Sequence, residues 1–332
     1  MKNINVPFQD LYAQYKTIKS EINFATKSLL RGNLVAFPTE TVYGLGADAQ
    51  NADAVSKIYH VKGRPTDHPL IVHLSSTKKL STWTKNLPEY SLKLASAFWP
   101  GPMTLILPRS NIVQDFLTGA QDNVAIRVPS HPVALALLTE FELQGGLGIV
   151  GPSANKFGKV SPTTANDVVV ELSLNLKQQD LIIDGGTSKV GLESTIINCL
   201  GIRPEIVRPG AVTPLMIEEL LGITLVSNAS QHSYSIRVPG MMKSHYSPSA
   251  KVFITGEPKK GDGFIAIAEI PTPIGVIRLA SPKNNIEFAS ILYESLRLAD
   301  SKKLERVVVV PPKGDDIAIA IRDRLSRCSY KE

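Results

Sequence analysis

One stretch of the sequence, FPTETVYGLGADAQNADAVSKIYHVKGRPTDHPLIVHL from Phe37 to Leu74, brings together residue types that bind anions. Lys62 and Arg64 flank Gly63 and precede a proline, in a turn where backbone and ligand can approach closely. Arginine offers a planar fork of donors and lysine a point charge, and both hold phosphate. The two cations therefore predict a phosphate clamp; the structural alternative is that they complement the dipole at a helix C-terminus.

Two further polar residues lie within predicted strands. His73 shares a strand face with Ile71, and Arg127 in the run VAIRVP points to the face opposite the three large apolar side chains. A buried histidine is often only a hydrogen-bonded core residue. A cation on the inner face of a sheet is costly unless paired. Either a buried carboxylate or an anionic ligand must therefore face Arg127, and the sequence leaves both open.

Hydroxyl, amide and cationic side chains stand where other strands end, which is where α/β proteins place ligands. Ser153 and Asn155 follow a strand in the loop GPSAN, although such residues also satisfy the backbone of ordinary turns. Ser161 precedes a proline and is predicted either to cap the next helix or to donate to a phosphate. Ser194 opens the strand STIINCL, and Arg208 lies where a strand enters a turn. Together they predict one polar site built from several strand ends.

Other kinds of chemistry are disfavoured by spacing. The run GPSANKFGKV has six residues between its glycines and a valine after the lysine, so it is not a Walker A loop. Glu40 and Glu193 could hold magnesium or act as bases, but structural pairing is the commoner fate of such residues. The two cysteines are far apart and the six histidines are scattered, which disfavours a disulfide scaffold or a zinc site.

The composition is that of a globular protein with two domains. The chain has 332 residues, 43% of them hydrophobic and 20% charged, with a net charge of +6. The positive excess is not gathered in one tail, which favours local anion sites over a basic nucleic-acid arm. No apolar run is long enough for a signal peptide or a membrane span, so we expect a cytoplasmic protein without membrane contact.

The apolar pattern predicts a mixed α/β sheet with helices. A helix is expected over 18–29 and another over 52–62, capped by Asn51 and ended by Gly63. Short apolar runs predict strands, and PTETVYGLG is predicted to be a turn. Residues 1–226 form the predicted first domain, 227–249 a polar linker, and 250–332 a small second α/β domain.

The motifs FPTETVYGLG, KGRPTDHPLIVHL, AIRVP, GPSAN, SPT, ESTII and IVRPG, in this order, resemble the YrdC-type threonylcarbamoyl-adenylate synthases. PGMMKSHYSP followed by a small α/β unit resembles the long, two-domain form of that family. The resemblance implies a YrdC-like open, mixed, twisted sheet with flanking helices and a small Rossmann-like C-terminal domain. It also implies a nucleotidyltransferase that joins L-threonine, bicarbonate and ATP into L-threonylcarbamoyl-AMP, with release of pyrophosphate and with Mg²⁺ accompanying ATP. This is the first step of tRNA threonylcarbamoyladenosine modification.

Matching motif by motif assigns residues to two subsites. The resemblance implies that threonine is held by Thr41, His73, Arg127 and Ser194, with Arg127 pairing its carboxylate. It implies that ATP is held by Lys62, Arg64, His68, Asn123, Ser153, Asn155, Ser161, Arg208 and Tyr246, with Lys62 and Arg64 as the catalytic cations. His68 stands where asparagine is common in the family. Tyr246 lies in the predicted linker, which would then be an active-site lid.

Two other functions fit parts of the sequence. A non-catalytic module that binds double-stranded RNA or tRNA would show steep salt dependence and no need for threonine. A carbamoyl-transferring maturation enzyme can use a similar nucleotide-binding domain, but zinc-finger cysteines are absent here. The downstream tRNA modification machinery is the expected partner of a synthase, with a weak tRNA contact also possible.

Overall fold

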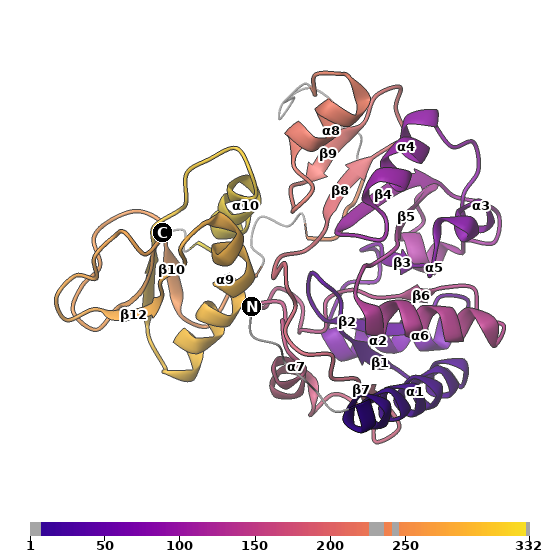
Figure 1. The fold of residues 1–332 in the computed structure, drawn as a ribbon, viewed down its shortest axis with the longest axis horizontal. Helices are drawn as coiled ribbons and strands as arrows, with labels where there is room; N and C mark the ends of the chain where they lie inside the picture. Colours follow the sequence, from indigo (N-terminus) through magenta and orange to yellow (C-terminus); the bar gives the residue numbers. More distant parts are fainter. Residues whose placement is uncertain (1–7, 226–235, 241–245, 330–332) are drawn as a thin grey trace.

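The computed structural model describes residues 8–225, 236–240 and 246–329, which form two α/β units side by side (Figure 1). The larger unit contains α1 (Phe8–Leu30), β1 (Val35–Phe37), β2 (Gly44–Asp48), α2 (Ala52–Lys62), β3 (Ile71–His73), η1 (Thr77–Lys79), α3 (Leu80–Trp83), α4 (Glu89–Phe98), β4 (Met103–Pro108), α5 (Asp115–Thr118), β5 (Asn123–Arg127), α6 (Pro132–Leu143), β6 (Ile149–Val150), α7 (Ala165–Leu172), β7 (Leu181–Ile182), β8 (Thr195–Asn198), β9 (Glu205–Arg208) and α8 (Pro214–Leu221). The smaller unit contains β10 (Lys251–Phe253), β11 (Gly263–Ile265), β12 (Ile277–Ala280), α9 (Asn285–Ser301), β13 (Arg306–Val309) and α10 (Ala318–Cys328).

The larger unit is built on a nine-stranded mixed sheet in the order β7-β1-β2-β6-β3-β5-β4-β8-β9. β3 and β5 are parallel, β4 runs antiparallel to β5, and β8 runs parallel to β4. The smaller unit has a four-stranded parallel sheet in the order β10-β13-β11-β12. The predicted fold class, a mixed sheet with flanking helices plus a small α/β unit, is confirmed.

The two faces of the large sheet are covered differently. One face packs along its length on apolar side chains of α2, α4, α7 and α8. On the other face, α1 and α6 cover the part that carries Val35, Phe37 and Ile149. The rest of that face, over β3, β5, β4 and β8, packs on Ile236 and Val238 instead of a helix. A polar site can lie inside the fold where the part of the face covered by α1 and α6 meets the part covered by Ile236 and Val238.

The two units share an apolar core. Leu192 and Val160 of the larger unit belong to the same buried cluster as Phe288 and Leu292 of α9. α9 and α10 face the larger unit, and the small sheet lies on their far side (Figure 1). At Gly191, whose φ is +74°, a side chain would meet the Cα of Ser290 at 2.5 Å. The C-terminal unit is therefore docked with its backbone in contact with the larger unit.

The local predictions agree with most elements. α2 begins with the Asn51 side chain accepting from the Ala54 N–H at 3.0 Å and ends at Gly63, whose φ is +59°. The turn prediction for PTETVYGLG is wrong at its end, because β2 begins at Gly44 and pairs with β1. The short helices η1, α3 and α5 were not predicted; they are too short to show a period. Most of the predicted linker, 227–249, lies outside the described residues, so the domain boundaries stay a prediction.

The close approach at Gly191 can be tested with a matched pair of substitutions. Gly186 has a similar φ of +80° but open space where a Cβ would lie, whereas at Gly191 a Cβ would meet the backbone of α9. We expect Gly186→Ala to lower the free energy of unfolding by about 1 kcal/mol, the cost of a strained φ. Gly191→Ala should cost about 3 kcal/mol or more, because α9 must also move. Urea unfolding measures both, and equal costs would contradict close docking at this point.

Candidate functional site

Four neighbouring strands carry a row of polar side chains at one end of the same sheet face. Each polar residue is two positions from an apolar residue that packs under Val238: His73 with Ile71, Arg127 with Ala125, Thr104 with Ile106, and Ser194, directly before β8, with Ile196. Because side chains two positions apart share a face, each pair points the same way. The strand directions place all four polar members at one end. The row lies within the face that Val238 covers in part.

Arg127 is paired by a carboxylate that the sequence did not identify as its partner. Its Nη2 donates to Glu40 Oε1 at 2.7 Å, and its Nη1 donates to Thr41 Oγ1 at 2.8 Å. Glu40 also accepts from the Ser130 N–H at 3.1 Å. A third bond runs from Arg127 Nε to the Gly101 carbonyl at 3.4 Å. A guanidinium has five N–H donors, so among the described residues two remain for a substrate carboxylate.

His73 lies beside Arg127 in register and is 2% exposed. Its Nδ1 has no hydrogen-bond partner among the described residues. Burial, together with a smaller contribution from the charge of Arg127, lowers its pKa to about 3. The imidazole is therefore neutral at ordinary pH, with its ring edge against Phe37 at a centroid distance of 5.8 Å. A buried, neutral and unpaired ring nitrogen is suited to a polar substrate group.

Ser194 and Arg208 form the other end of the row. Arg208 donates to the Ser194 carbonyl from Nε at 3.1 Å and from Nη2 at 2.9 Å, and to Ser194 Oγ at 3.1 Å. Ser194 Oγ is also hydrogen-bonded to Thr104 Oγ1 at 2.7 Å, where either hydroxyl can be the donor. Arg208 Nη1 donates to the carbonyl of Pro239, a residue of the predicted linker, at 3.0 Å. The linker is thus held directly over this end of the row.

Lys62 is not an exposed cation at a helix end. Its side chain is buried, and Nζ donates to the carbonyls of Ser153 and Asn155. Burial lowers the pKa of Lys62 well below its ordinary value, with a further contribution from the charge of Arg64. Lys62 does lie in the last turn of α2, as the dipole alternative expected, but its burial shows that it is not a solvent-exposed charge. The lysine joins the KGRP turn to the PSAN loop, as a ligand site shared by both would require.

Arg64 lies beside Lys62 and is also buried. Its Nη2 donates to the Pro69 carbonyl at 2.9 Å, and its guanidinium lies 5.7 Å from the ring centre of Phe157, whereas its Nε has no partner among the described residues. Burial lowers the pKa of Arg64 to about 10, so it remains a cation. The half-buried His68 packs edge-on against the same Phe157 ring, and burial lowers its pKa. These groups form one cationic and aromatic cluster.

The remaining two amides occupy different places. Asn155 is 1% exposed; its amide donates to the carbonyls of Lys156 and Lys159 at 2.7 and 2.9 Å, and its Oδ1 lacks a partner among the described residues. Asn123 is half-buried and begins β5, four residues before Arg127, so it lies at the far end of that strand. The structure therefore separates Asn123 from the row and places it toward the end of the sheet where the parallel strand β3 begins.

Ser161 and Tyr246 lead to residues that sequence reasoning missed. Ser161 Oγ donates to Glu193 Oε1 at 2.5 Å, and Thr164, not Ser161, caps α7. Tyr246 is 1% exposed and stacks on Tyr293 at a centroid distance of 5.8 Å. Glu193 and Glu40, left without a role by the sequence, both pair with arginines. No local signal could have identified Arg324, the partner of Glu193, because it lies 131 residues away.

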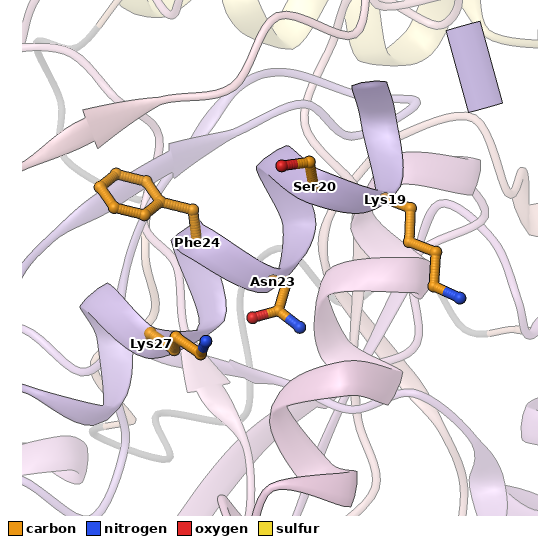
Figure 2. A pocket seen from close by; sticks show the side chains of 5 residues that line it. All are labelled: Lys19, Ser20, Asn23, Phe24 and Lys27. Atoms are coloured by element: carbon orange, nitrogen blue, oxygen red, sulfur yellow. The ribbon is translucent and has the colours of Figure 1, made fainter. Parts of the chain in front are cut away.

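The site residues therefore fall into two groups. Thr41, His73 and Arg127 form one, and Lys62, Arg64, Ser153 and Asn155 form the other; Arg208, which is bonded to Ser194, is close enough for its charge to act on Arg64, and Ser161 is bonded to Glu193. Among the described residues, no cluster of three or more His, Cys, Asp or Glu side chains could hold a metal ion. A shallow hollow on α1, lined by Lys19, Ser20, Asn23, Phe24 and Lys27, includes none of these residues (Figure 2). Because this hollow is open and lined by a single helix, it is a poorer candidate for a ligand site than the buried row.

The fold and this row define a two-unit α/β protein whose buried cations and hydroxyls can receive small anionic molecules. A family model described as telomere recombination, covering Sua5, YciO and YrdC proteins, matches residues 27–210. A second model, described as the threonylcarbamoyl-AMP synthase C-terminal domain, matches residues 212–329. The chain belongs to the threonylcarbamoyl-AMP synthase family, in its two-domain form.

Relatives that match nearly the whole chain support this family membership. Threonylcarbamoyl-AMP synthases from Bacillus subtilis and Pyrococcus abyssi are each 36% identical to it, over 97% and 93% of this chain and 96% and 94% of theirs. The crystal structure of P. abyssi Sua5 complexed with L-threonine superimposes with a TM-score of 0.83 at 34% identity, covering 94% of both chains. No helix within the described ranges is long and apolar enough to cross a membrane.

The buried neutral His73 predicts a pH dependence of stability. Its pKa is about 3 in the folded chain against 6.5 when exposed, so the unfolded chain binds the extra proton between these values. Folding stability is therefore lost as pH falls below about 6.5. We expect His73 to contribute a loss of about 2 kcal/mol between pH 7 and pH 5. Urea unfolding of the wild type and of His73→Gln measures it; parallel pH profiles would contradict the assignment.

Proposed function

We propose that this protein catalyses the formation of L-threonylcarbamoyl-AMP from L-threonine, bicarbonate and ATP, with release of pyrophosphate. It would act as a nucleotidyltransferase that supplies the adenylate for tRNA modification. Family membership over the whole chain supports the reaction, and the buried row from His73 to Arg208 is the observation that carries it. A non-catalytic RNA-binding module would have no need of cations and hydroxyls buried inside the fold, since RNA phosphates are contacted at exposed surfaces.

The threonine subsite is proposed at the end of the row where Arg127, Thr41 and His73 meet. Arg127 would bind the substrate carboxylate with the two N–H donors that the described residues leave over. Neutral His73 would bind the amine or the hydroxyl, and Ser194, directly before β8, would line the same space. Glu40 neutralises Arg127 before substrate arrives, which keeps the cation stable inside the sheet.

The ATP subsite is proposed around Lys62, Arg64 and Arg208. Arg64 and Arg208 are buried cations, and a bound triphosphate would favour the charged form of the buried Lys62 beside Arg64; such desolvated charges act strongly on phosphate oxygens. Asn155, Ser153 and Ser161 would supply polar contacts, with His68 and Asn123 at the far edge and Tyr246 on the linker side. Lys62 and Arg64 would stabilise the charge that develops as pyrophosphate leaves.

The chemistry that these groups support is positioning and neutralisation. The threonine amine attacks bicarbonate, whose C–O bond breaks with loss of water, to form a carbamate; a carbamate oxygen then attacks the α-phosphorus as pyrophosphate departs. No nucleophilic side chain is required; the protein brings two anions together and excludes water from them. Both candidate carboxylates, Glu40 and Glu193, are committed to arginines, so the described residues do not form a magnesium site. We propose that Mg²⁺ enters with ATP, held by its phosphates.

The decisive experiment measures pyrophosphate release from ATP by the purified full chain. We expect release to require both L-threonine and bicarbonate, and to fall to background when either is left out. Carbamoyl phosphate should not replace them. Release that needs neither substrate would contradict the synthase assignment, and tight, salt-sensitive tRNA binding without any release would favour the RNA-binding alternative.

The division into subsites predicts opposite effects for two arginines. Arg127→Ala should raise the KM for L-threonine about 30-fold and the KM for ATP less than threefold, because a charge-assisted carboxylate contact is lost. Arg64→Ala should do the reverse. Since Arg127→Ala leaves Glu40 buried and unpaired, the double variant Glu40→Ala with Arg127→Ala serves as control. It should regain stability without regaining threonine affinity; recovery of both would show that Arg127 acts only structurally.

A further inference from the structure

Glu193 is a buried carboxylate to which both units contribute donors. It is 7% exposed, and its Oε1 accepts from Ser161 Oγ at 2.5 Å. Its Oε2 accepts from the Tyr293 hydroxyl of α9 and from Arg324 Nε of α10, each at 2.9 Å. Arg324 is fully buried and also donates to the Pro209 carbonyl at 3.0 Å. One carboxylate thus links a predicted ATP residue to two helices of the C-terminal unit.

The surrounding charges keep Glu193 ionised. Burial alone would raise its pKa, but Arg324, Arg208 and the Ser161 hydroxyl more than compensate and lower the pKa to about 2. Arg324 in turn is balanced by Asp323, whose Oδ2 accepts from Nη1 at 2.5 Å, and Asp323 also pairs with Arg327. At neutral pH the carboxylate is therefore ionised and acts only as an acceptor.

An ionised Glu193 determines how Ser161 can act. A serine hydroxyl has one proton and two lone pairs. Because Glu193 takes the proton, Ser161 can offer only lone pairs to a ligand, so it accepts from an N–H or O–H group. The sequence-based alternative in which Ser161 donates to a phosphate does not fit this geometry. A ribose hydroxyl or an adenine amino group has the donor that Ser161 requires.

The same two residues of the C-terminal unit also hold Tyr246. The Tyr246 ring stacks on Tyr293 with an interplanar angle of 23°, and the Arg324 guanidinium lies 5.2 Å from its centre. The Cβ of an alanine at Gly240 would lie 2.3 Å from the Tyr246 hydroxyl and 3.1 Å from Arg208 Nη1. Tyr293 and Arg324 therefore hold the linker tyrosine next to Arg208, while they orient Ser161 through Glu193.

We propose that Tyr293 and Arg324 of the C-terminal unit are positioning residues for the nucleoside part of ATP, acting through Glu193 on the Ser161 hydroxyl. This deepens the proposed function and rests on it for the identity of the nucleotide. The C-terminal unit thereby takes part in nucleotide binding without touching ATP itself. Its contribution falls mainly on ATP, because the contacts of Arg127, Thr41 and His73 involve neither α9 nor α10 and, of the threonine subsite, only Ser194 adjoins Glu193 in the chain.

The test measures the Kd of a non-hydrolysable ATP analogue and of L-threonine by calorimetry. Glu193→Gln keeps the shape but places an amide donor opposite Ser161. We expect the ATP-analogue Kd to rise about tenfold and the threonine Kd to change less than twofold. Tyr293→Phe, which removes one hydroxyl and keeps the stacked ring, should raise the ATP-analogue Kd about threefold. Equal losses for both ligands would show a general structural role and overturn the proposal.

A double-mutant cycle asks whether the effect passes through Ser161. In a Ser161→Ala background, Glu193→Gln and Tyr293→Phe should each change the ATP-analogue Kd less than twofold. Full, additive effects in that background would overturn the proposal. Arg306→Gln is the matched control, since it breaks an ion pair with Asp262 at 3.4 Å inside the C-terminal sheet and touches none of the four residues. It should leave both Kd values unchanged; an ATP-specific loss there would count against the proposal.

Three further results of these experiments have a defined meaning. If Glu193→Gln does not fold, because Arg324 and Arg208 lose their counter-charge, the cycle of Tyr293→Phe with Ser161→Ala decides alone. If the wild type binds the ATP analogue with the expected coupling but releases no pyrophosphate with threonine and bicarbonate, the proposed function fails and the positioning role stands. If the analogue does not bind the wild type, both are overturned.

Discussion

The structure depends on two buried arginines that each receive a counter-charge from a carboxylate far away in the sequence. Arg127 and Arg324 are both almost fully buried, and each is paired with a carboxylate distant in the sequence, Glu40 or Glu193. An unpaired ion in such an interior would cost several kcal/mol, so these pairs fix which segments must meet. The first pair ties the loop after β1 to the end of β5. The second ties the start of β8 to α10, and with it the C-terminal unit to the larger one.

Strand alternation then determines where chemistry can take place. Because side chains two positions apart share a face, a single face of β3, β5, β4 and β8 carries apolar residues at one end and polar residues at the other. α1 and α6 cover one side of that face and Val238 another. The polar row therefore lies in a desolvated place that is formed by the fold itself, where electrostatic contacts are strong.

The linker and the C-terminal unit complete the site in physically different ways. Described linker residues contact the row directly, since Pro239 accepts from Arg208 and Val238 packs on the apolar ends of the strands. The C-terminal unit contributes indirectly, because its Tyr293 and Arg324 contact Glu193 and Tyr246. In the proposed site, substrate binding would therefore be coupled to the docking of the two units.

Much of the fold and the types of site residue followed from the sequence, because helix capping and strand alternation depend on residues that are close together in the chain. The capping of α2, the alternation in β5 and the inward direction of Arg127 are set by neighbours in the chain. Partners could not be deduced, since Glu40 lies 87 residues from Arg127 and Glu193 lies 131 from Arg324. The sequence alone therefore determined that a buried cation needs a partner and that a polar site forms at the strand ends. Only the tertiary structure decided which carboxylate pairs with Arg127 and which with Arg324, because that choice depends on which distant segments pack together.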